Sequence, residues 1–131
     1  MVRLGLFHAR FLATLIAALT LATPAVAEDI GTSNATFSEA VQAVKDRDYR
    51  HAMKLFAMQA DQNQHDAQYN LALLLEAGKG VPQDFSKALA WAWSAKLGGI
   101  EAAGDLAEDL IDLLPEKAIE NVRKEVKARL E

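Results

Sequence analysis

The sequence predicts an all-α protein: a short α-solenoid of about three antiparallel helical hairpins that follows an N-terminal signal peptide. Apolar residues recur at helical spacing from residue 36 onward, and no stretch shows the period of two expected of a β-strand. Helix-start and helix-stop residues interrupt this pattern at regular intervals, and two short patterns recur 36 and 35 residues apart. Periods of that length on helix pairs indicate an α-solenoid.

Residues 1–27 have the three-part layout of a secretory signal. Arg3 and Arg10 supply positive charge, an apolar run of about 12 residues follows, and residues 25–27 are small, as a cleavage site requires. The apolar run is shorter than the roughly 20 residues of a membrane-spanning helix. We therefore expect cleavage after Ala27, with an uncleaved amphipathic or membrane anchor as the alternative.

Removal of the signal leaves an acidic chain. A short linker is expected over residues 28–35 and the helical domain over 36–131. Residues 28–131 hold 12 Lys and Arg against 18 Asp and Glu, a net charge of −6, so nucleic acid and anionic lipid are poor partners. The absence of cysteine excludes disulfides, thiolate metal sites and a cysteine nucleophile. A periplasmic or secreted location is predicted.

Each helix has its own start and stop signals. The segment Thr36-Phe37-Ser38-Glu39 is a capping box. Asp48 and Asp84 are N-cap residues, Gly78 and Gly98-Gly99 are stops, and Pro115 fits a first helical position. The predicted helices span about residues 36–46, 49–61, 66–77, 85–97, 100–114 and 115–130.

Self-comparison supports the repeat. The group Asp48-Tyr49 with Ala52 recurs as Asp84-Phe85 with Ala88, and Ala67 with Leu71-Ala72 recurs as Ala102 with Leu106-Ala107.

Residues 67–91 read AQYNLALLLEAGKGVPQDFSKALAW. This stretch resembles the Sel-one-like repeat (SLR), a relative of the tetratricopeptide repeat, and the best match covers about residues 67–99. Ala72 departs from the family pattern, which usually has Gly there. The resemblance implies a structural role for its motif residues: Ala67, Leu71, Gly78, Gly80, Val81, Asp84, Ala88 and Trp91. Trp91 is expected to fill the core between hairpins.

Helix faces separate core from candidate binding surface. On the third helix, Ala67, Leu71, Leu74 and Leu75 form the core arc. Tyr69, Leu73 and Glu76 lie opposite, where by resemblance they line a ligand groove, or else pack on the first hairpin. Trp93 belongs to a second apolar stripe on the fourth helix, which either receives a neighbouring hairpin or presents Trp93 as an interface anchor.

The last two helices have opposite charge. The fifth is acidic and the sixth is rich in Lys and Arg, so ion pairs between them are expected, or an acidic patch for a cationic partner. An apolar stripe on the sixth helix is expected to cap the solenoid: Ile119, Val122, Val126 and Leu130.

Catalysis finds little support in the sequence. His51 and His65 lack the spacing of metal ligands, and the Gly78-Lys79-Gly80 loop lacks the pattern of a phosphate-binding loop. We expect no catalytic, metal or cofactor residues. The predicted function is that of an exported interaction or scaffold module of the cell envelope, which binds a partner peptide or protein in its helical-repeat groove. The alternatives are a cell-wall-acting enzyme or inhibitor of the SLR family and a self-assembling structural subunit that forms homo-oligomers.

Overall fold

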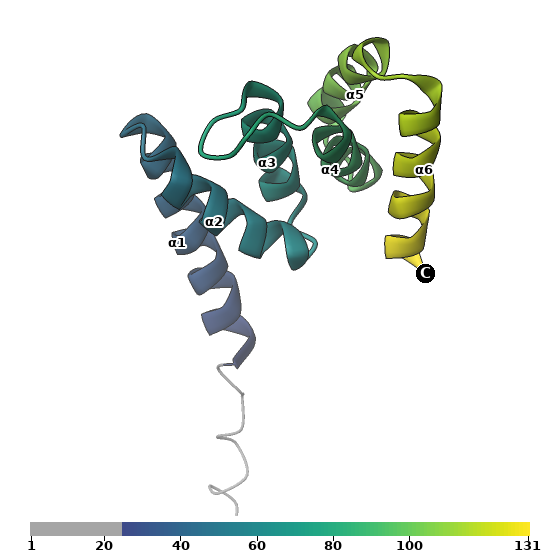
Figure 1. The fold of residues 1–131 in the computed structure, drawn as a ribbon. Coiled ribbons are helices and arrows are strands. Elements are labelled where there is room, and N and C mark those ends of the chain that lie inside the picture. The colour runs from purple at the N-terminus through teal and green to yellow at the C-terminus, as the bar shows by residue number, and fades with distance from the viewer. Residues whose placement is uncertain (1–24) are drawn as a thin grey trace, which may run out of the picture. The chain divides into compact units, whose positions relative to one another are not determined.

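A computed structural model describes residues 25–131, with side chains from residue 33 onward, and shows six helices in that part of the chain (Figure 1). They are α1 (Ala25–Lys45), α2 (Tyr49–Asp61), α3 (His65–Ala77), α4 (Phe85–Leu97), α5 (Glu101–Leu113) and α6 (Glu116–Leu130). The chain divides into two compact units, residues 1–32 and 33–131. The packing described below is that of the second unit. Most of the predicted signal segment, residues 1–24, lies outside the described residues.

Helix α1 begins earlier than the sequence predicted. The capping box placed its start at Thr36, but the helix runs from Ala25, so the expected linker at 28–35 is helical. No proline lies between residues 25 and 36, and the alanines and glutamate there favour a helix. Thr36 therefore occupies a position inside the helix.

Helices α2 to α4 have the predicted boundaries to within a residue. The Asp48 carboxylate accepts a hydrogen bond from the His51 backbone N–H at 3.2 Å, and Asp84 accepts one from the Lys87 N–H at 2.9 Å. Gly78 ends α3 in the left-handed conformation, with φ of 64°. Both N-caps and the glycine C-cap are confirmed.

The repeat period is 36 residues throughout. Helices α2 and α4 start 36 residues apart, and so do α3 and α5. The alignment of Ala67 with Ala102 at a period of 35 is wrong, because Ala67 is buried whereas Ala102 is exposed and its neighbour Ala103 is buried. Pro115 also differs from expectation, since it is the N-cap of α6 and not its first helical residue.

The loop from α3 to α4 is held against the preceding repeat. A Cβ at Gly80, whose φ is 80°, would lie 2.4 Å from the Tyr49 carbonyl oxygen. The Lys79 ammonium sits 5.1 Å from the centroid of the Tyr49 ring, and Val81 packs partly buried against the core. Glycine is therefore required at position 80 both for its backbone angle and for this close approach.

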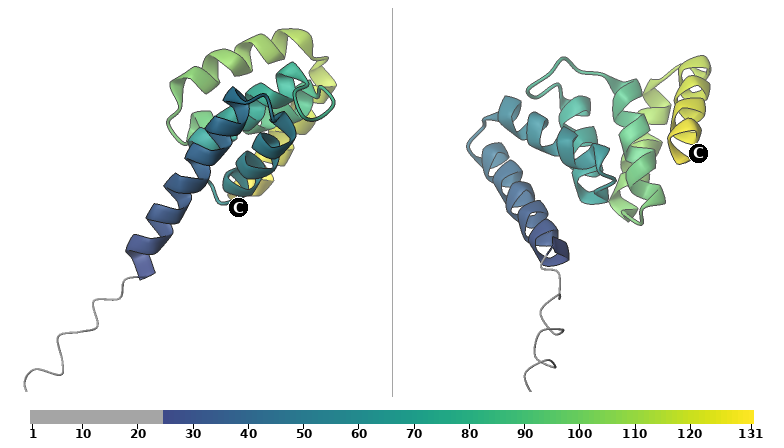
Figure 2. Two further views of the ribbon diagram at one scale, coloured as in Figure 1. Left: turned by 90° about the vertical axis from the view of Figure 1, so that its left-hand side faces the viewer. Right: turned by 90° about the horizontal axis from the view of Figure 1, so that it is seen from below.

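Helix α4 is the centre of the packing. It packs against α3, α5 and α6, and α3 also packs on α2 (Figure 2). Small residues let the helices approach closely, and Ala72, Ala88 and Ala95 are fully buried. Leu89 is fully buried as well, so α4 is covered on two sides.

Three expectations about side-chain packing are corrected. Trp91 does not fill the core, because its ring is only partly buried; Phe56, Leu89 and Leu110 are the largest fully buried apolar side chains. Leu130 is 68% exposed, although the rest of the α6 stripe is buried. Two bases of α6 pair within that helix, Lys124 with Glu120 and Arg129 with Glu125, and no ion pair joins α5 to α6 among residues 33–131.

Within the described part of the chain, every helix is too short or too polar to span a bilayer.

Candidate interaction site

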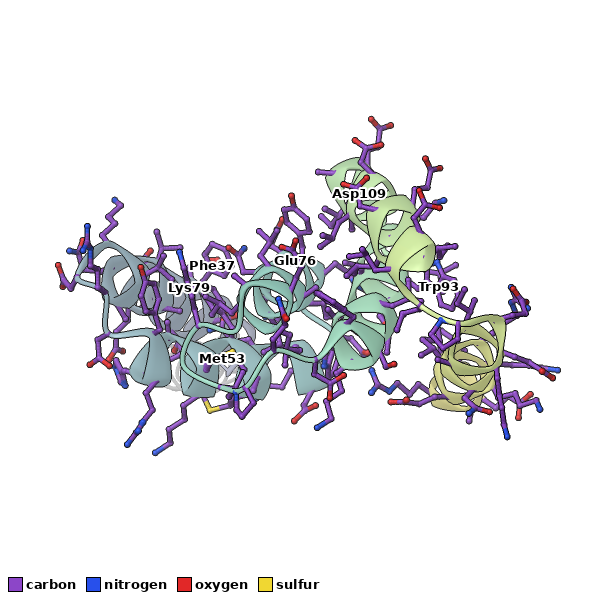
Figure 3. The ribbon with its side chains drawn as sticks, turned by 45° about the horizontal axis from the view of Figure 1, so that its top comes forward. Phe37, Met53, Glu76, Lys79, Trp93 and Asp109 are labelled. Carbon is purple, nitrogen blue, oxygen red and sulfur yellow. The ribbon has the colours of Figure 1, made fainter. Side chains whose placement is uncertain are left out.

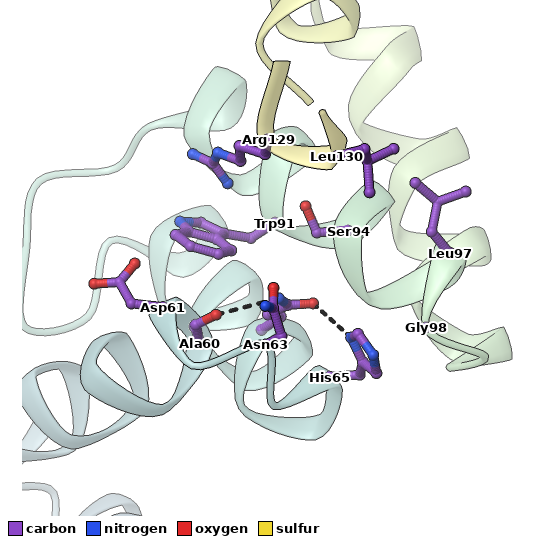
Figure 4. Close-up of a pocket in the computed structure, with 11 residues that line it drawn as sticks. Ala60, Asp61, Asn63, His65, Trp91, Ser94, Leu97, Gly98, Arg129 and Leu130 are labelled. Atoms are coloured by element: carbon purple, nitrogen blue, oxygen red, sulfur yellow. Dashed lines mark hydrogen bonds between the residues drawn. The ribbon is translucent and has the colours of Figure 1, made fainter. Parts of the chain in front are cut away.

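A cleft of about 440 Å³ opens beside Trp91 (Figure 4). The turn from α2 to α3, the middle of α4 and the end of α6 form its walls, so it joins segments from three successive hairpins. A second cleft of about 430 Å³ lies between α2, α3 and the 78–84 loop. Trp91 and Asp61 line both clefts, which places the indole ring between two hollows of the surface.

A cation covers one face of the Trp91 ring. The Arg129 guanidinium lies 4.2 Å from the ring centroid, and its Nη2 donates to Glu125 Oε1 at 2.5 Å. Stacking on the indole and the bond to Glu125 hold the guanidinium in one orientation. The stacked Trp91 ring and Arg129 guanidinium offer a ligand an aromatic edge and hydrogen-bond donors, respectively.

Apolar side chains at the rim of the Trp91 cleft are unusually exposed. Leu97 is 63% exposed and Leu130 is 68% exposed. Two further large apolar residues, Met58 and Leu113, are exposed elsewhere. Binding of a ligand in the Trp91 cleft would bury the exposed apolar surface of these leucines, which favours association.

The polar part of this cleft is organised by a buried amide. Gln68 is 3% exposed; its Nε2 donates to the Ala60 carbonyl at 3.2 Å, and its Oε1 lies 3.0 Å from His65 Nδ1. Because Gln68 Nε2 bonds to Ala60, Oε1 faces His65 Nδ1, and this contact fixes the orientation of the imidazole ring at the wall of the cleft.

Gly98 makes room for the His65 ring. A Cβ at that position would lie 2.0 Å from His65 Cγ. The sequence predicted Gly98 only as a helix stop and indicated only that His65 lacks the spacing of a metal ligand, although both line the cleft. Asp61 and Arg129 were also missed as cleft residues, because nothing in the local pattern brings α2, α4 and α6 together.

The residues predicted to bind a partner are not all in one place. Tyr69 and Leu73 are half-buried and pack against the core, and they line neither of the two clefts at Trp91. Glu76 is half-buried, and its backbone carbonyl accepts from Gln83 Nε2 at 2.7 Å. Trp93 faces α6 from the other side of α4, with Arg123 at 6.0 Å from its ring (Figure 3).

The histidines and carboxylates do not assemble into a metal site. His51 Nε2 lies 3.0 Å from Glu39 Oε1, and His65 contacts Gln68. Within the described residues, no group of three His, Asp or Glu side chains could hold a metal ion.

Stacked antiparallel helices with capped turns and a 36-residue period define an α-helical repeat protein, and an aromatic cleft across successive hairpins suits such a scaffold for binding. The Sel1 repeat family matches residues 45–64 and 65–96. Residues 45–96 of the chain therefore form Sel1-like repeats, and Sel1 repeats generally mediate contacts between proteins. The family match extends to the hairpin before the segment that the sequence singled out.

Two curated proteins share part of this sequence. The chain is similar to DAP3-binding cell death enhancer 1 of Mus musculus, with 46% identity over 46 residues, and to the same-named protein of Rattus norvegicus, again with 46% identity over 46 residues. The match covers 35% of this chain and 9% of the length of each of those proteins.

Proposed function

We propose that this protein is an exported interaction module of the cell envelope that binds a peptide segment of a partner protein in the clefts around Trp91. The observation that carries the proposal is the partly buried Trp91 ring, stacked under Arg129, between two clefts of about 430 and 440 Å³. Tryptophan and arginine in a hollow are the residue types that dominate binding energy at protein interfaces.

The chemistry of the two clefts suggests the kind of peptide. A large apolar side chain would pack between Trp91 and the exposed Leu97 and Leu130. Asp61, in both clefts, would attract a basic group, whereas the Arg129 guanidinium would donate to a carbonyl or carboxylate. A short segment with one apolar anchor flanked by polar groups satisfies these positions.

Binding can be tested with a library of random peptides displayed on phage and selected against the protein. The selected peptide is synthesised, labelled and titrated by fluorescence anisotropy. Trp91→Ala should weaken binding at least tenfold, because loss of a central aromatic anchor costs on the order of 2 kcal/mol. Met58→Ala is the matched control, since Met58 is 47% exposed and outside both clefts, and it should change binding less than twofold. Equal binding to the two variants would place the peptide elsewhere and refute the proposal.

The exported location has its own test. The layout of residues 1–27 supports removal of 27 residues, leaving a chain that begins at Glu28. Expression of the full chain in a Gram-negative host, followed by cell fractionation and intact-mass measurement, should give the shortened chain in the periplasmic fraction. Recovery of the full-length chain in the membrane fraction would favour an uncleaved anchor instead.

A further inference from the structure

We propose that the groove between α4 and α6 binds the acidic face of α5 from a second copy of this chain. This groove is centred on Trp93 and adjoins the Trp91 cleft, with which it shares Leu97 and Leu130. The proposal goes beyond peptide binding at Trp91, since Trp93 and the three bases beside it, which do not line the Trp91 clefts, carry it.

The Trp93 groove combines apolar and basic side chains. It has a volume of about 360 Å³, and its apolar part comes from Trp93, Val126 and the exposed Leu97 and Leu130. Its basic residues are Lys96, Arg123 and Lys127. The groove therefore suits a helix that carries carboxylates around an apolar contact.

Among residues 33–131, none of these three cations is in an ion pair. Each is exposed. The Arg123 guanidinium instead lies 6.0 Å from the Trp93 ring centroid. A concentration of unpaired positive charge stands out on a mature chain whose net charge is −6.

The complementary surface is the outer face of α5. The helix has no basic residue, and its acids are exposed on one side: Glu101, Asp105, Glu108, Asp109 and Asp112. None of the five is in an ion pair among residues 33–131. Figure 3 shows Asp109 directed away from the packed helices. Leu113, 58% exposed at the edge of this face, supplies an apolar side chain for the groove.

The two surfaces do not neutralise each other within one copy. Helices α5 and α6 both pack on α4, but they make no close contact of the kind that each makes with α4. Like charges spaced three and four residues apart on α5 repel one another, and none of the five acids is in an ion pair among residues 33–131. The acidic face of one copy and the basic groove of another are complementary in charge and in apolar content. We therefore infer that α5 of a second copy of the chain occupies the Trp93 groove.

Sedimentation equilibrium of the protein produced from the full 131-residue chain tests this association. The mass should rise toward that of a dimer or longer array with concentration at about 50 mM NaCl. It should return to that of the monomer at about 500 mM NaCl, where the Debye length falls from roughly 14 Å to roughly 4 Å. A mass that stays monomeric at every concentration, or that is indifferent to salt, would overturn the proposal.

Charge-reversal variants identify the two surfaces. Arg123→Glu/Lys127→Glu reverses the groove and Asp105→Lys/Asp109→Lys reverses the α5 face; each should weaken self-association at least tenfold. Mixing the two variants should restore association, because each then offers one surface that fits the other. Arg50→Glu/Lys54→Glu is the control, since these two exposed bases on α2 have the same spacing and lie outside the groove. It should associate like the unaltered chain.

The same variants also exclude other occupants. If Asp105→Lys/Asp109→Lys associates normally while the groove variant does not, α5 is not the occupant and the proposal is wrong. Loss of association in the Arg50→Glu/Lys54→Glu control would equally refute it, as would a mixture that stays monomeric. Circular dichroism on each variant shows that helical content is kept, as expected for substitutions at exposed positions.

Discussion

The helix pair α3–α4 and the helix pair α5–α6 occupy equivalent positions in successive repeats but differ in what they leave exposed. Helix α4 is covered by α3, α5 and α6, and its small residues are fully buried. Helix α5 buries one face and exposes five acids on the other, and α6 ends with Leu130 uncovered. An inner hairpin is constrained from two sides, whereas the last hairpin is constrained from one.

Two tryptophans of α4 contact the last helix, α6, through its arginines. Trp91 and Trp93 are two residues apart, so they project about 200° from each other around the helix. Arg129 stacks on the first and Arg123 lies over the second, and both arginines come from α6. Helix α6 therefore lines both the cleft of about 440 Å³ beside Trp91 and the groove at Trp93.

Substitution of Leu89 should have the largest effect on stability. Leu89→Ala leaves a cavity between α4 and its neighbours, and the free energy of unfolding should fall by about 2–5 kcal/mol, as for other fully buried leucines. Leu113→Ala, at an exposed leucine of the last hairpin, should change it by less than about 0.5 kcal/mol. Urea denaturation followed by circular dichroism measures both. Similar losses would mean that the terminal hairpin is as constrained as the inner one.

Substitutions at two glycines with positive φ compare the cost of steric contact with that of backbone strain. Gly80→Ala should cost about 1–3 kcal/mol, because the new Cβ would meet the Tyr49 backbone as well as adopt a strained angle. Gly99 has φ of 98°, and no atom lies within 4 Å of the Cβ that Gly99→Ala would add. Only backbone strain of about 1 kcal/mol is therefore expected from this substitution. The same urea titration compares them, and equal costs would show that the loop does not rest on Tyr49.

Most of the fold could be predicted because its signals are local. An aspartate that caps a helix, a glycine that ends one and an apolar arc every third or fourth residue act within one turn of the chain. Asp48, Asp84 and Gly78 accordingly perform the predicted roles. The start of α1 was missed because a capping box inside a longer helix has the same sequence as one at a helix start.

The candidate site was predicted less well because it depends on contacts between distant residues. Trp91 has an apolar neighbourhood in sequence, but its ring reaches Arg129, 38 positions later, and this places it at a surface cleft. Similarly, Gln68 is buried because it bonds to Ala60 and His65 around the α2–α3 turn. The spacing of apolar residues does not indicate which hairpin covers a second apolar face of a helix. The sequence therefore left two interpretations, core packing or partner binding, for Tyr69, Leu73 and Trp93.

The smallest expected effect compares the two arginines that lie over the tryptophans. Arg129→Lys keeps the charge but loses the planar group that stacks on Trp91 at 4.2 Å, and the free energy of unfolding should fall by about 0.5–1 kcal/mol. Arg123→Lys should matter less, because its guanidinium is 6.0 Å from the Trp93 centroid. Fluorescence measured in chains that keep one tryptophan, with the other changed to Phe, reports each ring separately. Arg129→Lys should shift the Trp91 emission, whereas Arg123→Lys should leave the Trp93 emission nearly unchanged. The reverse order would mean that the shorter distance does not reflect a stronger stack, and that α6 is held to α4 chiefly through the Trp93 side.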